Sequence, residues 1–288
     1  MKPSENAIKT GFFLTAFVSV TILGLIMIFL VKEGIPIFSH VSVRDFVFGQ
    51  YWYPTDDPPA YGIFPLIVGT FSVTLLSALI SVPIGVMSAI YIAEIARDRL
   101  AAVAKPMVEL LASIPSVVVG FFGMVVVSPF LQETFDIPTG LNLFNASLML
   151  AFMAVPTICS VTEDALKSVP KSLKEASLAL GATHFETITR ITVPAAMSGI
   201  STAVILGMSR AVGETMVVLM VAGGAAMNPR SIFDPVRPMP ASIAAEMGEA
   251  PFGGEHYSAL FATGIVLFLF TLIFNICAAR IARRYKQS

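Results

Sequence analysis

Six long apolar segments constrain the fold of this chain more than any other feature of its sequence. We place them near residues 11–31, 64–92, 107–130, 142–160, 195–222 and 259–281. A helix needs roughly 20 apolar residues to cross a hydrocarbon core about 30 Å thick, and each segment is close to or above that length. Since spanning structures must satisfy their backbone hydrogen bonds internally, the segments predict an all-α integral membrane protein. We expect residues 1–288 to form a single transmembrane domain with six membrane-spanning helices.

The composition agrees with this prediction. Of the 288 residues 56% are hydrophobic and 13% are charged, whereas soluble domains have about 25% charged residues. The first apolar segment does not end in a small-residue cleavage site of the Ala-x-Ala kind. We therefore interpret it as a retained membrane anchor and not as a signal peptide.

Lysine and arginine residues predict the orientation of the chain, because cytoplasmic loops are enriched in them. Thirteen basic residues would lie on one side of the predicted helices: Lys2, Lys9, Arg97, Arg99, Lys105, Lys167, Lys171, Lys174, Arg190, Arg280, Arg283, Arg284 and Lys286. Only Lys32, Arg44, Arg230 and Arg237 would lie on the other side. Both termini and segment 161–194 are therefore expected in the cytoplasm. These basic residues are the ordinary fringe of spanning helices, so nothing supports nucleic-acid binding.

Segment 161–194, between the fourth and fifth apolar segments, has the pattern of two short capped helices. Ser172 to Glu175 and Thr183 to Glu186 both have the Ser/Thr-x-x-Glu form of a capping box. Gly181 lies between them and is typical of a helix C-terminus. The sequence thus predicts a polar helical hairpin outside the membrane.

The first helix of this hairpin is expected to need a partner surface. It is about ten residues long, which is too short for stability in water on its own. Leu173, Ala176 and Leu180 would form an apolar stripe, while Ser177 and Gly181 are small residues that permit close protein contact. The alternative is a helix that lies on lipid headgroups. We favour contact with a protein, because these small side chains offer little apolar area to lipid.

The fifth apolar segment contains the charged sequence Arg210-Ala-Val-Gly-Glu214-Thr215. A charged side chain near the centre of a spanning helix costs about 2.5–3.5 kcal/mol, so Arg210 and Glu214 must face protein or water. Their i, i+4 spacing predicts that they lie on one helix face. They could form a buried ion pair that locks two helices together. They could instead line a solute pathway, in which the guanidinium group binds an oxyanion.

Glu214 requires its own explanation, because a carboxylate repels anions. It could hold Arg210 in place, and it could accept a hydrogen bond from hydrogen phosphate, which carries a proton that sulfate lacks at neutral pH. Ala203, Gly207 and Ala211 repeat every four residues beside this patch. Such a row of small residues predicts close packing against another helix, which could belong to a second permease subunit.

Segments 32–63 and 223–258 are the long connections on the opposite side. Their proline and glycine dipeptides predict ordered turns and short interfacial pieces, which could receive a soluble donor protein. For Trp52 and its neighbours Tyr51 and Tyr53 we favour a role as anchors at the membrane interface.

Several kinds of chemistry find no support in the sequence. The histidines do not cluster and Cys159 and Cys277 suggest no disulfide framework, so we propose neither a metal site nor a catalytic residue. The chain has no Gly-x-x-x-x-Gly-Lys-Ser/Thr motif, so any ATP must be bound by another subunit. Prolines within the apolar segments, such as Pro115 and Pro156, predict kinks.

Two sets of motifs resemble known transport proteins. Glu175-Ala176-Ser177, followed by Gly181 and then Ile191-Thr192-Val193-Pro194, resembles the EAA loop of ABC importer permeases, with Ser177 for Ala and Val193 for Leu. The segments 114–118 (IPSVV) and 210–216 (RAVGETM) resemble the permeases of phosphate-specific ABC transporters. Segments 34–38 and 231–256 are similar to the PstC branch of that family.

The resemblance implies a type I ABC importer fold (MetI-like) with a cytoplasmic coupling helix. It implies a PstA-like second permease, a PstB-like ATPase dimer that binds ATP and Mg²⁺, and a PstS-like phosphate-binding protein, in the cytoplasmic (inner) membrane of a bacterium or archaeon. This chain would bind no cofactor. Arg210, Glu214 and Thr215 would lie on the phosphate pathway, and the residues for ATPase coupling would be Glu175, Ala176, Ser177, Leu180 and Gly181.

Three alternatives remain. A permease for sulfate or molybdate would share the fold and the coupling loop. An ATP-independent secondary transporter or channel could use a buried Arg and Glu, but it would not need the capped hairpin. An intramembrane enzyme is least supported, because the spans contain no nucleophile with a matching base.

Overall fold

The structure is a computed structural model that describes residues 5–285, so Lys2 and Lys286, both used above to orient the chain, lie outside it. Six helical segments in this range are long and apolar enough to cross a membrane, which confirms the predicted fold class. Five of these segments contain one long helix each: α1 (Glu5–Gly34), α3 (Phe64–Ile90), α7 (Leu143–Lys167), α10 (Val193–Val212) and α13 (Glu255–Tyr285).

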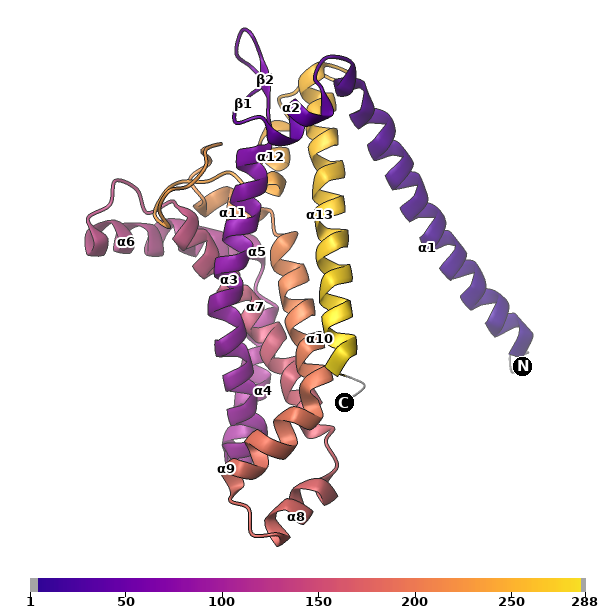
Figure 1. The fold of residues 1–288 in the computed structure, drawn as a ribbon, viewed down its shortest axis with the longest axis vertical. Coiled ribbons are helices and arrows are strands. Elements are labelled where there is room, and N and C mark those ends of the chain that lie inside the picture. The colour runs from indigo at the N-terminus through magenta and orange to yellow at the C-terminus, as the bar shows by residue number, and fades with distance from the viewer. Residues whose placement is uncertain (1–4, 286–288) are drawn as a thin grey trace.

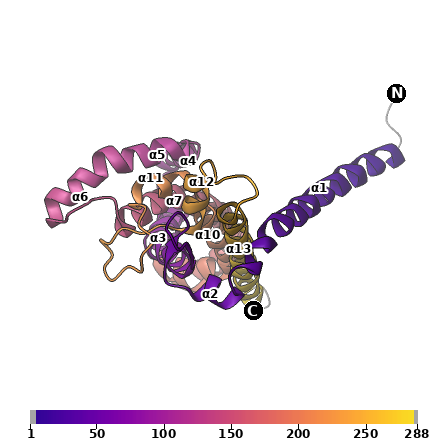
Figure 2. The same cartoon turned by 90° about the horizontal axis from the view of Figure 1, so that it is seen from above.

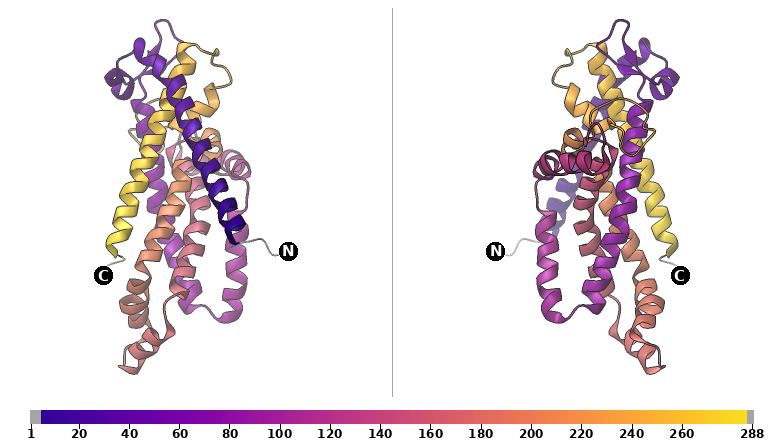
Figure 3. Two further views of the ribbon diagram at one scale, coloured as in Figure 1. Left: turned by 90° about the vertical axis from the view of Figure 1, so that its right-hand side faces the viewer. Right: turned by 90° about the vertical axis from the view of Figure 1, so that its left-hand side faces the viewer.

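Helices α3, α7, α10 and α13 run side by side along the long axis of the molecule (Figures 1 and 3). Helix α7 lies at the centre of this bundle. Of the residues in its most apolar 18-residue stretch, 61% are buried. Helix α1 runs away from the bundle (Figure 2). It contacts α13 at its C-terminal end, where Gly34 approaches the backbone of Ala262, and residues 8–33 are nowhere buried. A membrane-length apolar helix is thus left without cover from its own chain.

The third apolar segment, predicted at 107–130, is not one straight helix. It is divided among α4 (Asp98–Ala112), α5 (Ser116–Phe122), the π-helical turn η3 (Gly123–Val127) and α6 (Ser128–Phe135). Helix α4 follows the bundle, whereas α6 lies across it (Figures 1 and 3). The break follows from Pro115, which has no backbone N–H and disfavours helical geometry at the preceding residue.

The core of the bundle depends on close contact between Ile158 of α7 and two glycines. A Cβ atom added to Gly85 of α3 would lie 2.8 Å from Ile158 Cγ2, and one added to Gly207 of α10 would lie 2.5 Å from Ile158 Cγ1. Ile158 is completely buried. The row of small residues at 203, 207 and 211 therefore packs closely, as predicted, but against α7 of the same chain and not against a second subunit.

Short ordered elements cover the end of the bundle opposite α8 (Figure 1). This confirms the turns and short pieces predicted for the two long connections. They are the 3₁₀ turn η1 (Ile35–Ser39), α2 (Val43–Phe48), an antiparallel hairpin of β1 (Trp52–Tyr53) and β2 (Ala60–Tyr61), and α12 (Met239–Glu246). Helix α11 (Met216–Val221) belongs instead to the predicted fifth apolar segment.

Trp52 is not a membrane-interface anchor, so this interpretation of the sequence is wrong. Its side chain is 1% exposed, and its Nε1 donates to the Glu246 carboxylate at 3.0 Å. The same carboxylate accepts hydrogen bonds from Arg237 at 2.6 Å and Ser242 at 2.9 Å, and it pairs with His256 at 2.8 Å. A buried indole needs such an acceptor. Glu246 thereby joins the hairpin to α12 and α13.

Tyr61 provides a second link between the hairpin and α13. Its hydroxyl donates to Glu255 Oε2 at 3.1 Å. Burial, together with the hydrogen bond and the charge of Glu255, raises the pKa of Tyr61 to about 12. The hydroxyl therefore keeps its proton, and with it this hydrogen bond, throughout the physiological pH range.

The packing at Ile158 makes a prediction about stability. Gly207→Val should destabilise the bundle by about 1–3 kcal/mol through overpacking. Gly24→Val on exposed α1, where an added Cβ has nothing within 4 Å, is the matched control. Thermal denaturation of the detergent-solubilised chain should show a lower midpoint for Gly207→Val only. The double variant Gly207→Val with Ile158→Ala should lose less stability than the sum of the losses in the two single variants. Equal midpoints for the two glycine variants would contradict the packing argument.

Candidate functional site

Residues 168–192 form a helical hairpin that projects from one end of the bundle (Figure 1), whereas residues 161–167 of the predicted segment still belong to α7. It contains α8 (Lys171–Ala179) and α9 (His184–Thr187), and the π-helical turn η4 (Ile188–Thr192) continues α9 into α10. Gly181 separates the two helices with a φ of +88°, a conformation that favours glycine. The fifth membrane-competent segment therefore begins at His184 and not near residue 195.

One of the two predicted capping boxes forms. The Glu186 backbone N–H donates to Thr183 Oγ1 at 3.2 Å, and the Thr183 N–H donates to Glu186 Oε2 at 2.9 Å. The box predicted at Ser172 to Glu175 is wrong, because α8 begins at Lys171 and has no side-chain cap. Pro170 precedes that first residue, and Ser172 therefore lies inside the first helical turn.

The hairpin exposes apolar side chains. No residue of α8 is buried, and Leu180 and Phe185 are 90% and 73% exposed. Leu173 and Leu178 are each nearly half exposed. An apolar surface on so short a helix is typical of a segment that docks on another protein.

The residues of the EAA-like motif differ in their surroundings. Glu175, Ala176 and Gly181 are exposed, whereas Ser177 is half-buried. The Ser177 hydroxyl is hydrogen-bonded to the hydroxyl of Thr187 at 3.0 Å. This contact sets α8 against the start of the continuous α9–α10 helix. A serine in place of the usual alanine therefore has a local structural role.

An ion pair attaches the hairpin to α3. Lys174 Nζ lies 2.6 Å from Glu94 Oε1, and the Glu94 side chain is 7% exposed. Glu94 belongs to the π-helical turn η2 (Tyr91–Ile95), which extends α3. Sequence analysis missed this pair, because nothing local connects two residues 80 positions apart. This ion pair thus links α8 to the end of α3.

A second charged cluster connects α4 to α7 nearby. Lys105 Nζ lies 2.6 Å from both Glu163 and Asp164, and Lys167 also pairs with Glu163. Hydrogen bonds to Asp164 and Glu163 raise the pKa of Lys105 above its usual value. Lys105 thus stays charged and neutralises Glu163, whose side chain is 2% exposed. The helices that lead to the hairpin are therefore held together by ion pairs.

The predicted helical arrangement of Arg210 and Glu214 is wrong. Helix α10 ends at Val212, and residues 213–215 separate it from α11. Glu214 Oε1 accepts hydrogen bonds from the backbone N–H groups of Met216 at 3.2 Å and Val217 at 3.4 Å. Glu214 therefore caps α11 and does not lie one turn above Arg210 on a shared helix. Thr215 is half-buried, and its hydroxyl donates to the Gly213 carbonyl at 3.3 Å.

Arg210 is exposed on α10, and within residues 5–285 its side chain forms no ion pair or hydrogen bond. The alternative of a buried Arg210–Glu214 ion pair is therefore wrong for the described structure. Both residues nevertheless line one small depression beside α7, together with Leu150, Met153 and Gly207 among others. An unpaired guanidinium on a membrane-competent helix must face water, solute or another protein.

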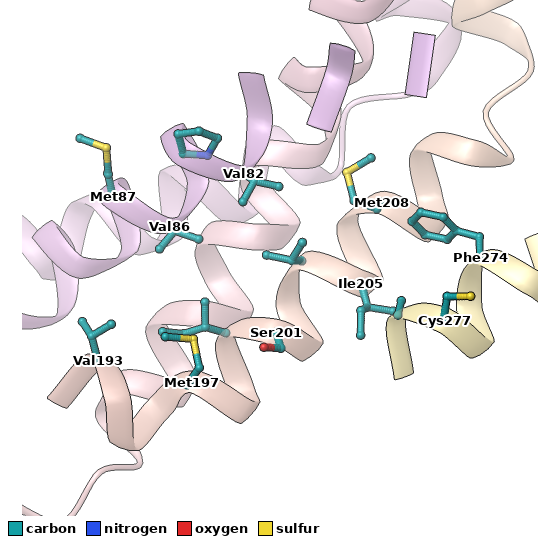
Figure 4. A pocket seen from close by; sticks show the side chains of 14 residues that line it. Val82, Val86, Met87, Val193, Met197, Ser201, Ile205, Met208, Phe274 and Cys277 are labelled. Atoms are coloured by element: carbon teal, nitrogen blue, oxygen red, sulfur yellow. The ribbon is translucent and has the colours of Figure 1, made fainter. Parts of the chain in front are cut away.

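A much larger cavity lies elsewhere and is apolar. It has a volume of about 690 Å³ and lies between α3, α10 and α13 (Figure 4). Its labelled side chains are valines, methionines, an isoleucine, a phenylalanine, a cysteine and Ser201. Such a lining cannot replace the hydration of an ion, so this cavity is not a site for a charged solute. Among residues 5–285 no group of three His, Cys, Asp or Glu side chains could hold a metal ion.

Comparison with known proteins gives the family. Residues 81–287 match the model of the family described as binding-protein-dependent transport system inner membrane component. The chain is 41% identical over 263 residues to a probable ABC transporter permease, YqgH of Bacillus subtilis, covering 91% of this chain and 85% of that protein. It is 33% identical to the phosphate transport system permease protein PstC of Haemophilus influenzae, covering 84% and 82%.

Solved structures show the same fold. A chain of a bacterial alginate ABC transporter superposes with a TM-score of 0.65 at 19% identity, covering 98% of both chains. A chain of the MetNI methionine ABC transporter gives a TM-score of 0.58 at 23% identity, covering 78% of this chain and 94% of that one. These identities support the MetI-like fold and no particular solute.

Fold and family together define a membrane-spanning permease subunit of an ABC importer, and the chain belongs to the family of binding-protein-dependent transport system inner membrane components. Within that family it is a PstC-type permease of the inner membrane. Such a subunit is not an enzyme, because the ATPase is a separate subunit. A second permease and a substrate-binding protein complete an importer of this family.

The ion pair between Lys174 and Glu94 predicts a coupling defect. Lys174→Ala leaves Glu94 buried without a partner, which should reduce ATP-driven uptake by the assembled importer several-fold. Lys171→Ala, in the same helix at an exposed position, is the matched control and should retain uptake. The exchange Lys174→Glu with Glu94→Lys should recover part of the loss. Equal uptake by the two alanine variants would contradict a role for this pair.

Proposed function

We propose that this permease conducts inorganic phosphate into the cell, together with a PstA-like second permease. The observation that carries the proposal is the unpaired, exposed guanidinium of Arg210 at the end of α10, beside Glu214. Guanidinium donors suit the oxygens of an oxyanion. The PstC name of the Haemophilus relative supports phosphate as the solute.

Glu214 would make the permease prefer phosphate to sulfate. Its Oε1 accepts hydrogen bonds from the α11 backbone, while its Oε2 has no partner within the described residues. That oxygen can accept a hydrogen bond from the protonated oxygen of hydrogen phosphate while Arg210 donates to the other oxygens. Sulfate offers no proton at neutral pH, so it would meet an unopposed negative charge. Thr215 lies in the same break between α10 and α11 and adds a hydroxyl group to the patch formed by Arg210 and Glu214.

The exposed surfaces suggest where the partners bind. A PstA-like permease would cover exposed α1 and would face Arg210 of α10 across the pathway. A PstB-like ATPase dimer, which holds ATP and Mg²⁺, would receive α8 through Glu175, Ala176, Ser177, Leu180 and Gly181. A PstS-like phosphate-binding protein would dock on the short elements at the opposite end.

The direction of α1 and α13 agrees with a cytoplasmic position for the hairpin. Helix α1 begins, and α13 ends, toward the end of the molecule that carries α8 (Figure 1). We propose that this end is cytoplasmic, because it also carries most of the basic residues. Closure of the ATPase dimer would then move α8, and the Lys174–Glu94 pair would carry this movement to α3, alternately opening the pathway on each side.

Another oxyanion, such as sulfate or molybdate, is the second candidate. A guanidinium group binds each of these anions, and the Bacillus relative is named only as a probable permease. The two candidates differ in what they require of Glu214, so that residue distinguishes them.

Uptake of labelled phosphate tests the proposal. Cells without their own high-affinity phosphate permease would receive this chain with its partners. Uptake should depend on ATP and resist excess sulfate and molybdate. Arg210→Ala should reduce it at least about tenfold, the factor for one lost charged hydrogen bond of about 1.4 kcal/mol or more.

Arg190→Ala, exposed near the hairpin, is the matched arginine control and should keep most of the activity. Assembly of each complex is checked by copurification of the ATPase. Uptake of sulfate or molybdate in place of phosphate by the assembled complex would contradict the proposed solute.

Glu214→Gln tests the discrimination argument separately. The glutamine amide keeps the shape of the glutamate side chain and one of its oxygens. It is neutral, however, and is a weaker hydrogen-bond acceptor than a carboxylate. We expect slower phosphate uptake and a preference for phosphate over sulfate reduced by about tenfold, equivalent to roughly 1.4 kcal/mol. Competition by sulfate against labelled phosphate is the measurement. An unchanged rate and an unchanged preference would exclude this role for Glu214.

A further inference from the structure

A polar contact joins α10 to α13 within two of the membrane-competent segments. The Ser209 hydroxyl donates to Asn275 Oδ1 at 2.6 Å. Ser209 is half-buried, and Asn275 is exposed. The neighbours of Asn275 on α13 are Ile273, Phe274 and Ile276. An exposed amide among such residues requires an explanation.

The side-chain amide of Asn275 has donor groups without a partner. Its carbonyl oxygen is occupied by Ser209, which leaves the two N–H donors of Nδ2. Within residues 5–285 these donors have no partner. An amide that faces lipid without a partner costs roughly 2–7 kcal/mol, so the donors must face water, solute or another protein. Ser209 therefore holds the carbonyl oxygen of Asn275 and leaves its Nδ2 group as the donor available to another molecule.

The contact lies one residue before Arg210 in the sequence, and consecutive residues of a helix point about 100° apart, so Ser209 and Arg210 flank the exposed side of α10. Ser209 is the preceding residue, and the exposed side of α10 runs along Thr202, Leu206 and Arg210 at intervals of four residues. Ser209 lies between this side and the contact with α13. Asn275 consequently lies at the border of the surface that carries the free guanidinium.

We propose that Asn275, held by Ser209, is a specificity-determining residue that donates hydrogen bonds to the oxyanion next to Arg210. This inference rests on the proposed function, in which the exposed side of α10 lines an oxyanion pathway. Neutral donors beside one guanidinium stabilise an anion without adding a second positive charge. The anion is thereby held and still released, as transport requires.

The competing explanation is that Ser209 and Asn275 only hold α10 and α13 together. Interhelical hydrogen bonds from serine and asparagine have that role in many membrane proteins. The two explanations make opposite predictions for Asn275→Asp. This change keeps the Oδ1 acceptor for Ser209 and nearly the same shape, but it replaces the donor group by a negatively charged oxygen.

The experiment measures phosphate uptake by the complete importer with Asn275→Asp, Asn275→Leu and Ser209→Ala. Thr271→Val, one turn away on α13, is the control, since the Thr271 hydroxyl is bonded to the Phe268 carbonyl of its own helix. Copurification of the ATPase reports assembly. We expect Asn275→Asp and Asn275→Leu to assemble normally and to raise the KM for phosphate at least tenfold. Ser209→Ala should have a smaller effect, and Thr271→Val none.

Uptake with an unchanged KM in Asn275→Asp would overturn the inference, as would a larger effect of Ser209→Ala than of Asn275→Leu. If Asn275→Asp fails to assemble, Asn275→Leu decides, and normal transport by that variant overturns the inference. A wild-type importer that carries sulfate or molybdate instead of phosphate would refute the proposed solute alone. The same variants, measured with that anion, would still test Asn275. A wild-type complex that carries no oxyanion would refute both.

Discussion

The arrangement of the whole bundle depends on the contact of Ile158 with Gly85 and Gly207. Because neither glycine has a side chain, α3 and α10 approach α7 closely on two sides. This packing fixes the rotation of α10 about its own axis. The side with Ala203 and Gly207 is committed to α7, so Thr202, Leu206 and Arg210 remain exposed. The close packing of small residues on α10 therefore sets the direction in which Arg210 points.

Helix interruptions place the remaining polar groups. Glu214 and Thr215 lie where α10 gives way to α11, and the freed backbone N–H groups of Met216 and Val217 are bound by the Glu214 carboxylate. Broken helices occur at membrane depth only where protein or water satisfies their ends. Ion pairs play the corresponding part at the other end of the bundle, since Lys174 and Lys105 link the hairpin, α3, α4 and α7. The Lys174–Glu94 ion pair links the hairpin to α3, and α3 packs on α7 through Gly85. Helix α7 in turn packs on α10, which carries Arg210 and ends just before Glu214.

Sequence patterns predicted what is local. The six apolar segments and the capping box at Thr183 depend on neighbouring residues, and both are present. Predictions failed where distant residues decide. Trp52 is buried because Glu246, 194 positions away, accepts its hydrogen bond. The 107–130 segment is divided because Pro115 breaks it, and Glu214 leaves its expected helix to cap the next one. Lys174 with Glu94 and Ser209 with Asn275 had no local signal at all.

The central claim is that the side of α10 carrying Arg210 faces a water-filled anion pathway. Thr202→Cys, placed two turns before Arg210 in a Cys277→Ser background, tests this directly through its reaction with a negatively charged, membrane-impermeant thiol reagent. Cys159 is buried and can remain. A pathway predicts rapid labelling in the assembled importer, and phosphate should slow it more than sulfate does. An unreactive thiol, or labelling that phosphate does not affect, would mean that this side of α10 contacts lipid or a partner helix.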